Sequence, residues 1–136
     1  MSAALAYDRN NVFARILRGE LPCQKVYEDE FALAFNDIRP LAPVHVLVIP
    51  KGEYVALTDF ATSAPPTVIA GFWRAVAKTA VQLGLEPGGY RVVSNAGADG
   101  GQIVFHMHVH IFGGRAMSQR MGNMPRPNEA STDKKD

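Results

Sequence analysis

The sequence predicts an α+β domain in which two helices accompany a mainly antiparallel five-stranded sheet. The length of 136 residues suits one domain, and the hydrophobic content of 47% exceeds that of disordered chains. Along the chain, the periodic patterns follow one another as a helix, three strands, a helix and two strands. Strands grouped in this way favour antiparallel pairing over the strict strand–helix alternation of a parallel sheet.

The first half of the chain is expected to contain one helix and three strands. Apolar residues recur at helical spacing over 10–18, with Asn10 as the expected N-cap. Two short strands are predicted at 25–28 and 31–35, on either side of a turn. The β-branched run at 44–49, which a proline closes, predicts a third and stronger strand.

The second half is expected to contain one long helix and two strands. The helix is predicted at 63–84, where prolines occupy the first turn and a glycine follows the last apolar residue. The strands are predicted at 90–94 and 103–112. Residues 117–136 are polar and contain prolines, which predicts an irregular tail.

Composition restricts the class of protein. We expect the whole chain, residues 1–136, to form one domain with its core at about 11–115. The net charge of +1 provides no field that would attract nucleic acid or an anionic membrane. The single cysteine, Cys23, excludes an internal disulfide and a cysteine metal cluster. Without a secretory leader or the roughly 20 apolar residues of a membrane helix, the chain is expected to be soluble and cytoplasmic.

Three histidines, His106, His108 and His110, alternate with apolar residues in the last predicted strand. Because side chains of a strand alternate between its faces, the three imidazoles are expected on one face at spacings of roughly 7 Å. Met107 and Val109 then face the core. One histidine in a strand is usually structural, but three titratable groups on one face are costly unless they are used. The pattern therefore indicates a functional site.

The remaining histidine, His45, lies in the middle of the predicted strand 44–49. Taken alone, it is more often a structural residue than a functional one. A functional role for His45 is favoured if its strand lies beside the strand that carries the triad. The sequence leaves this pairing open.

A glycine-rich loop at 94–102 leads directly into the triad. Its glycines allow backbone N–H groups to approach an anion closely, although such loops are mostly just turns. Its position next to the imidazoles predicts a phosphate held beside them. Asp37 follows a predicted strand end, where a carboxylate either accepts two sugar hydroxyls or closes a turn.

The run from His106 to Phe112 resembles the signature of the histidine triad (HIT) family, three alternating histidines followed by two apolar residues. Six further segments within residues 11–115 resemble the Hint branch of this family. They are Phe13–Ile16 with Gly19–Pro22, Tyr27–Asp29, Ala34–Pro40, Ala42–Lys51, Gly89–Arg91 and Asn95–Gln102. The resemblance implies a HIT-like fold and a homodimer whose sheet continues across the interface. It also implies purine nucleoside phosphoramidase or adenylyl-lysine hydrolase activity.

The resemblance assigns catalytic roles to the four histidines. His108 matches the nucleophile that attacks the α-phosphorus and becomes nucleotidylated. His110 and His45 match residues that contact the phosphate oxygens, and His106 matches the supporting member of the triad. A neutral imidazole is a nitrogen nucleophile, so this assignment agrees with the chemistry of the side chain.

Five further residues match positions that bind the substrate. Asp37 matches the ribose-binding carboxylate, and Ile38 matches the residue that packs on a purine base. The positions that hold the phosphate end of the nucleotide correspond to Asn95, Gly101 and Gln102.

The sequence departs from the family pattern at three places. Ile103, which also belongs to the predicted binding site, stands where the family usually has Ser or Thr. The tail after Gly114 lacks an aromatic-Pro-Pro-Gly segment, and the region of Asn11 and Phe13 lacks a zinc-binding Cys-x-x-Cys pair.

The predicted enzyme is a hydrolase that needs no metal or other cofactor, because imidazoles and backbone amides can position a phosphate and stabilise its charge. Two alternatives remain open at this stage. One is a zinc-dependent hydrolase, in which His-x-His is joined by a ligand from another strand, although no Asp or Glu closely follows the triad. The other is a nucleotide-binding adaptor with little turnover.

Overall fold

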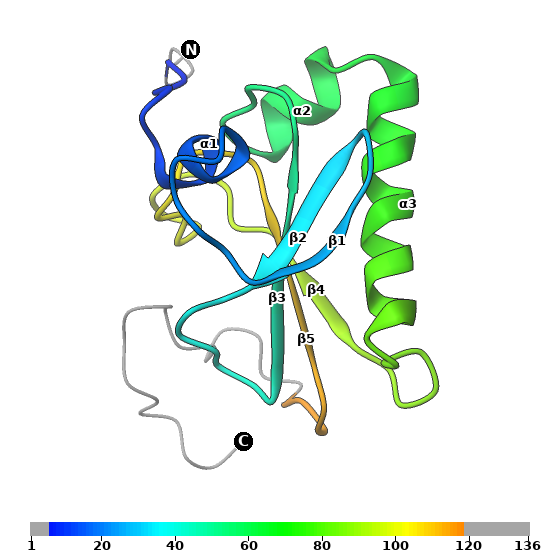
Figure 1. Cartoon of the computed structure of the whole chain (residues 1–136). Helices are drawn as coiled ribbons and strands as arrows, with labels where there is room; N and C mark the ends of the chain where they lie inside the picture. The colour runs from blue at the N-terminus through cyan, green and yellow to red at the C-terminus, as the bar shows by residue number, and fades with distance from the viewer. Residues whose placement is uncertain (1–5, 119–136) are drawn as a thin grey trace.

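The computed structural model describes residues 6–118 of the chain (Figure 1). Its helices are α1 (Val12–Leu17), α2 (Leu57–Ser63) and α3 (Pro66–Gln82). Its strands are β1 (Lys25–Glu28), β2 (Ala32–Asn36), β3 (Val44–Pro50), β4 (Arg91–Val93) and β5 (Val109–Gly113). The expected irregular tail falls mostly on residues 119–136, which lie outside the described part.

The strands form one five-stranded sheet in the order β1-β2-β3-β5-β4, and every neighbouring pair is antiparallel. The predicted fold class is therefore confirmed. Strand β5 comes last in the chain but pairs between β3 and β4, so the histidine-bearing strand lies inside the sheet. Its position places His110 beside the strand that carries His45.

The two faces of the sheet carry different layers. Helix α3 runs along one face (Figure 1) and packs on alternate strand residues such as Val46, Val48 and Ile111. On the other face, Phe13 of α1 packs on a smaller apolar cluster that includes Leu47. The period-two alternation of these strands assigns their residues to the two layers. The histidine side chains lie on the face of α1.

Helix α2 was not expected, because the sequence predicted only two helices. It is one short element whose start depends on Asp59. The Asp59 carboxylate accepts hydrogen bonds from the backbone N–H groups of Val55 and Ala56, both at 2.8 Å. A carboxylate in the first turn satisfies donors that have no partner within the helix.

The last predicted strand is wrong in its first half, because β5 begins at Val109 and not at Ile103. Residues 103–108 lie outside the sheet, and there the N–H of Met107 donates to the carbonyl of Tyr54 at 2.7 Å. Strand β1 has the predicted bounds and β3 begins at the predicted residue, whereas the other boundaries differ by one to three residues. The N-cap of α1, for example, is Asn11 and not Asn10, and its side chain accepts from Ala14 N–H at 2.9 Å.

No helix among residues 6–118 is long and apolar enough to cross a membrane.

Candidate active site

The four histidines meet on one face of the sheet. The β3–β5 register pairs Leu47 with His110 and His45 with Phe112, so His45 and His110 are diagonal neighbours. The rings of His108 and His110 lie 5.1 Å apart between their centroids, although His108 precedes β5. All four side chains are buried, His106 completely. The side chains of the residues just before β5 therefore alternate between the two faces as they would in a strand.

A backbone carbonyl determines the tautomer of His108. Its Nδ1 lies 2.7 Å from the carbonyl oxygen of His106, which can only accept a hydrogen bond. Nδ1 therefore carries the proton of the neutral ring, and Nε2 keeps a free lone pair. Because His108 also lines the cavity described below, that lone pair is available to a ligand.

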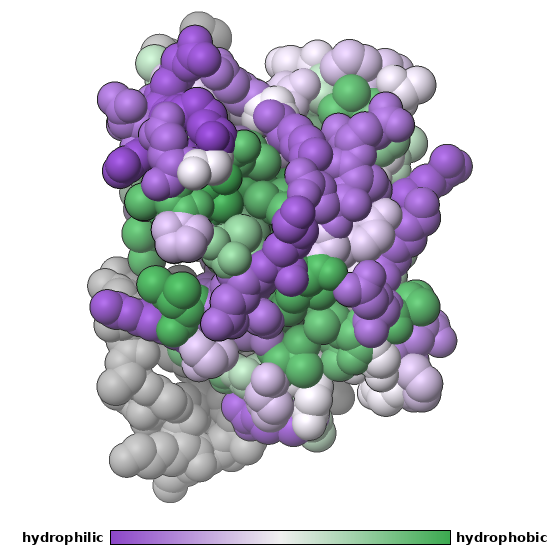
Figure 2. Space-filling model, in the orientation of Figure 1, coloured by the Kyte–Doolittle hydropathy of each residue, from purple (hydrophilic) through white to green (hydrophobic). Residues whose placement is uncertain are grey.

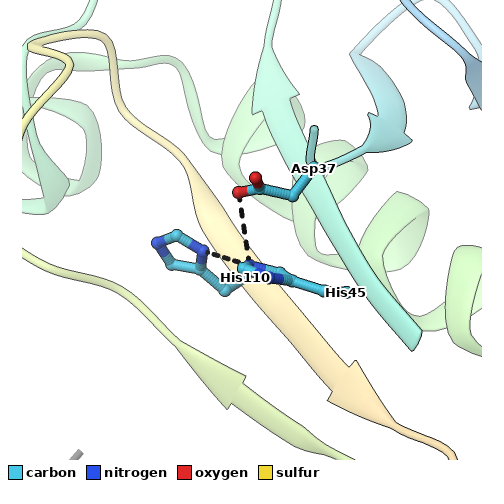
Figure 3. Close-up of side chains that lie close together, drawn as sticks. All are labelled: Asp37, His45 and His110. Atoms are coloured by element: carbon cyan, nitrogen blue, oxygen red, sulfur yellow. Dashed lines mark hydrogen bonds and ion pairs between the residues drawn. The ribbon is translucent and has the colours of Figure 1, made fainter. Parts of the chain in front are cut away.

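A chain of hydrogen bonds determines the opposite tautomer for His110. The N–H of Leu41 donates to Nδ1 of His45 at 3.1 Å, which leaves the ring proton of a neutral His45 on Nε2. This Nε2–H donates to Nδ1 of His110 at 2.9 Å (Figure 3). His110 must then carry its own proton on Nε2. The site thus combines a lone pair on His108 with an N–H donor on His110.

Burial keeps the rings neutral. It lowers the pKa of His106 from 6.5 to about 4 and that of His110 to about 3. It also lowers the pKa of His108 and His45, although the negative charge of Asp37 opposes this effect in both. At neutral pH every ring therefore carries one proton, and the tautomers derived above apply.

A cavity of about 250 Å³ opens beside His108 and His110. Apolar side chains of α1 form one wall, and residues at the end of β2 form another. Its main lining residues are Val12, Phe13, Ile16, Cys23, Phe35, Asp37, Ile38, Leu47, Ile103 and Val104. Figure 2 shows apolar side chains gathered near α1, between more polar segments. A mostly apolar cavity with a few polar groups at one end is typical of small-molecule sites.

Two lining residues expose unusual amounts of apolar surface. Ile38 is 92% exposed and Ile103 is 55% exposed, although both belong to the cavity wall. Exposed aliphatic side chains at a cavity rim can pack on the flat face of a ligand. Asp37 stands beside Ile38, and its Oδ1 accepts the N–H of Arg39 at 2.8 Å, which closes a turn. Its Oδ2 lies 3.4 Å from Nε2 of His45 (Figure 3).

The glycine-rich loop is held by the side chains of Gln102 and Asn95. The Gln102 amide accepts from Gly97 N–H at 2.9 Å and donates to the Val55 and Val104 carbonyls at 2.7 and 3.0 Å. Asn95 donates to the carbonyl of Gly100 at 2.7 Å. The Gln102 side chain thus shapes the loop rather than pointing into the cavity.

Gly101 lies in the same loop and lines the cavity. Its φ of +85° falls in the left-handed region, so the turn beside the cavity requires a glycine. Of the predicted binding residues, Asp37, Ile38, Gly101 and Ile103 line the cavity together, whereas Asn95 and Gln102 support its loop.

Two contributors to the site were missed by the sequence analysis. Phe13 reads as an ordinary core residue of α1, yet its ring meets the His108 ring edge-on at 5.0 Å between centroids. Tyr7 lies before α1 in a segment without periodic pattern, and its hydroxyl lies 2.6 Å from Nδ1 of His106. No local sequence signal distinguished either Phe13, which is buried like other core residues, or Tyr7.

One group of side chains has the composition of a metal site. Ligand atoms of Asp37, His45 and His110 all lie within 4.8 Å of one another (Figure 3). Two imidazoles and a carboxylate are ligands that Zn²⁺ takes. The carboxylate that the sequence did not show near the triad is therefore supplied by the loop after β2.

Comparison with known proteins identifies the family to which the chain belongs. The HIT domain family matches residues 18–117, and the chain belongs to this family. It is 56% identical over 114 residues to a 13.2 kDa HIT-like protein of Azospirillum brasilense, covering 84% of this chain and 93% of that protein. It is 48% identical over 113 residues to a 14 kDa zinc-binding protein of Zea mays, covering 82% and 87%.

Solved structures of HIT family proteins are also similar to this chain. A HIT family hydrolase from Clostridium thermocellum has a TM-score of 0.76 and 39% identity, covering 82% of this chain and 96% of that one. A HIT family hydrolase from Legionella pneumophila also has a TM-score of 0.76, with 40% identity, covering 82% and 98%.

Proposed function

We propose that this protein is a metal-independent hydrolase of the Hint type, which cleaves purine nucleoside phosphoramidates or adenylyl-lysine at the P–N bond. The observation that carries the proposal is the hydrogen bond between Nδ1 of His108 and the His106 carbonyl, because it leaves Nε2 unprotonated on a ring that lines a cavity with apolar walls. The base packs against Ile38 and the α1 side chains, and Asp37 accepts the ribose hydroxyls. The phosphate end lies toward Gly101, His108 and His110.

The reaction takes two displacements at phosphorus. Nε2 of His108 attacks the α-phosphorus, the P–N bond breaks, and the amine leaves with a proton taken from solvent. Water then attacks the nucleotidyl-His108 intermediate, which releases the nucleoside monophosphate and restores the lone pair of Nε2. His110 Nε2–H donates to a phosphoryl oxygen, and the charge that develops there is stabilised by this bond.

The proposal is tested by trapping the intermediate. The wild-type protein is mixed with adenosine or guanosine phosphoramidate, quenched rapidly and analysed by intact mass. We expect one added nucleotidyl group per chain, which EDTA does not abolish and which His108→Ala lacks. Turnover without any adduct on His108 would refute the covalent route.

A zinc-dependent hydrolase is the second candidate, favoured by the proximity of Asp37, His45 and His110. The relative from Zea mays is described as zinc-binding. For this candidate, EDTA abolishes turnover and Zn²⁺ restores it. A nucleotide-binding adaptor, the third reading, would bind AMP without forming product even in a single-turnover experiment.

We also propose that the protein is a homodimer in which the sheet continues from one protomer to the next through β4. Strand β4 forms one edge of the sheet. Apolar side chains near that edge and on α3 are partly exposed, among them Trp73, Tyr90 and Val92. An edge strand with exposed apolar side chains favours pairing with another strand.

A further inference from the structure

The segment before α1 reaches the histidine triad through one side chain. The hydroxyl of Tyr7 lies 2.6 Å from Nδ1 of His106, a residue 99 positions away in the chain. The two rings meet edge to face, with centroids 5.6 Å apart and planes at 64°. His106 is completely buried, so the Tyr7 hydroxyl, and not bulk water, is the hydrogen-bond partner of its Nδ1.

The direction of this hydrogen bond follows from the other side of the His106 ring. Nε2 lies 2.8 Å from the carbonyl oxygen of Pro50, so Nε2 holds the ring proton and Nδ1 accepts. Tyr7 is then the donor. Burial raises the pKa of the Tyr7 hydroxyl above its ordinary value of 10.0, although the Asn11 side chain opposes this. The hydroxyl therefore keeps its proton at neutral pH.

His106 connects Tyr7 to the reactive ring. The carbonyl oxygen of His106 is the acceptor that holds Nδ1–H of His108 at 2.7 Å. The His106 side chain is hydrogen-bonded at both ring nitrogens, to the Tyr7 hydroxyl at Nδ1 and to the Pro50 carbonyl at Nε2. A residue anchored at both ends of its ring has little freedom to rotate, and its backbone carbonyl keeps its direction.

Tyr7 is itself held in place by the turn that leads into α1. Within this turn, Asn11 N–H donates to the carbonyl of Asp8 at 3.1 Å, and Asn10 N–H donates to the Asp8 carboxylate at 2.8 Å. The Arg18 guanidinium donates to the carbonyl of Arg9 at 2.7 Å, which ties the segment to the end of α1. The Tyr7 hydroxyl is thus presented to His106 by an ordered backbone.

We propose that Tyr7 is a positioning residue for the nucleophile His108, acting through His106. This inference rests on the proposed function, in which Nε2 of His108 attacks phosphorus. The Pro50 carbonyl sets the tautomer of His106, and the Tyr7 hydroxyl holds the orientation of its ring. The His106 carbonyl in turn keeps the proton of His108 on Nδ1. Tyr7 touches neither the substrate nor the reacting atoms.

The test compares Tyr7→Phe with a matched control, Tyr27→Phe. The control removes another tyrosine hydroxyl that donates to one side chain, Asp29, at 2.9 Å, but far from the triad in the β1–β2 hairpin. We expect Tyr7→Phe to lower kcat about fivefold to tenfold with KM unchanged, because one hydrogen bond is lost from the support of the nucleophile. Tyr27→Phe should leave both constants unchanged.

A second readout does not depend on turnover. In protein labelled with ¹⁵N-histidine, long-range ¹H–¹⁵N spectra report which ring nitrogen of each histidine is protonated. We expect the Tyr7→Phe protein to show a changed Nδ1 resonance for His106 and a mixture of tautomers for His108, whereas Tyr27→Phe gives the wild-type spectrum. If the wild-type protein hydrolyses no phosphoramidate, the proposed function fails, yet these spectra still decide the role of Tyr7.

The variant Tyr7→Leu separates the hydroxyl from the ring. Equal losses of kcat in Tyr7→Phe and Tyr7→Leu assign the effect to the hydrogen bond. A loss in Tyr7→Leu alone, or wild-type kcat and His108 resonances in Tyr7→Phe, would overturn the proposal, since the Tyr7 ring would then matter only for packing against His106.

Discussion

At the scale of single residues, the chemistry of this site depends on which ring nitrogen of each histidine holds the proton. Backbone groups make that choice for His106 and His108, through the carbonyls of Pro50 and His106. The N–H of Leu41 determines the tautomer of His45, and Nε2–H of His45 determines that of His110. Backbone groups are fixed by the fold, so the neighbouring rings of His108 and His110 present a lone pair and a donor.

We expect His108→Ala to bind AMP nearly as well as the wild-type protein but to lose turnover by about a thousandfold or more, since loss of a nucleophile removes the covalent route. Calorimetric titration with AMP and steady-state turnover of adenosine phosphoramidate measure the two properties. Residual turnover within tenfold of wild type would show that another residue attacks phosphorus.

Ile103 should limit the rate for substrates with a poor leaving group. Its side chain is 55% exposed at the cavity rim and cannot pass or orient a proton. A hydroxyl hydrogen bond there is worth about 0.5–1.5 kcal/mol, or a several-fold change in rate. We therefore expect Ile103→Ser to raise kcat/KM for adenylyl-lysine several-fold and to change it little for a nucleotide ester with a good leaving group. Equal responses of the two substrates would contradict this role.

The pH dependence of adduct formation follows from the lowered pKa of His108. Burial lowers this pKa from 6.5, against the opposing effects of the His106 carbonyl and Asp37. The neutral ring is the reactive form, so a lowered pKa moves the loss of activity to more acidic pH. Single-turnover rates measured by quenched flow should stay constant from pH 8 to about 6.5 and fall only at lower pH. A rate that already halves near neutral pH would mean that the ring titrates with a raised pKa.

At the scale of elements, α3 packs on the sheet through a glycine. A methyl group at Gly71 would overlap the ring of Phe31, at the tip of the β1–β2 hairpin. The absent side chain therefore allows the helix and the hairpin to approach closely. This contact lies at the start of β2, at the opposite end of the strand from Asp37.

We expect Gly71→Ala to lower the free energy of unfolding by about 1–3 kcal/mol, because the overlap outweighs the gain in helix propensity. Urea unfolding measures the change. In the background of Phe31→Ala, where the clashing ring is absent, the same substitution should stabilise the protein. Destabilisation of similar size in both backgrounds would show that the Phe31 ring is not the cause.

At the scale of the whole molecule, the proposed dimer predicts a mass by light scattering of twice the 14.8 kDa of one chain. Val92→Glu places a charge on the edge strand and should shift the mass toward that of the monomer. Leu57→Glu is the matched control, since Leu57 on α2 is 38% exposed, as Val92 is. A wild-type monomer, or equal dissociation by both variants, would contradict a dimer formed through β4.

The fold class and the faces of the strands follow from apolar patterns in the sequence. Apolar periodicity is a local property, and it correctly placed Met107 and Val109 in the core and the histidines on the opposite side. The alternation held even at His106 and His108, which precede β5 and lie outside the sheet. The prediction of a strand from Ile103 failed because pairing with a neighbour, which alternation does not encode, defines a strand.

Which distant groups meet depends on how the elements pack together. Antiparallel pairing of β3 with β5 brings His45 to His110, and the loop after β2 brings Asp37 to both. The tautomers depend on backbone groups of Leu41, Pro50 and His106, whose positions no side-chain pattern reveals. Tyr7 reaches His106 across 99 residues. Contacts at such separations arise from the packing of the whole chain, because no local periodicity records which segments will become neighbours in space.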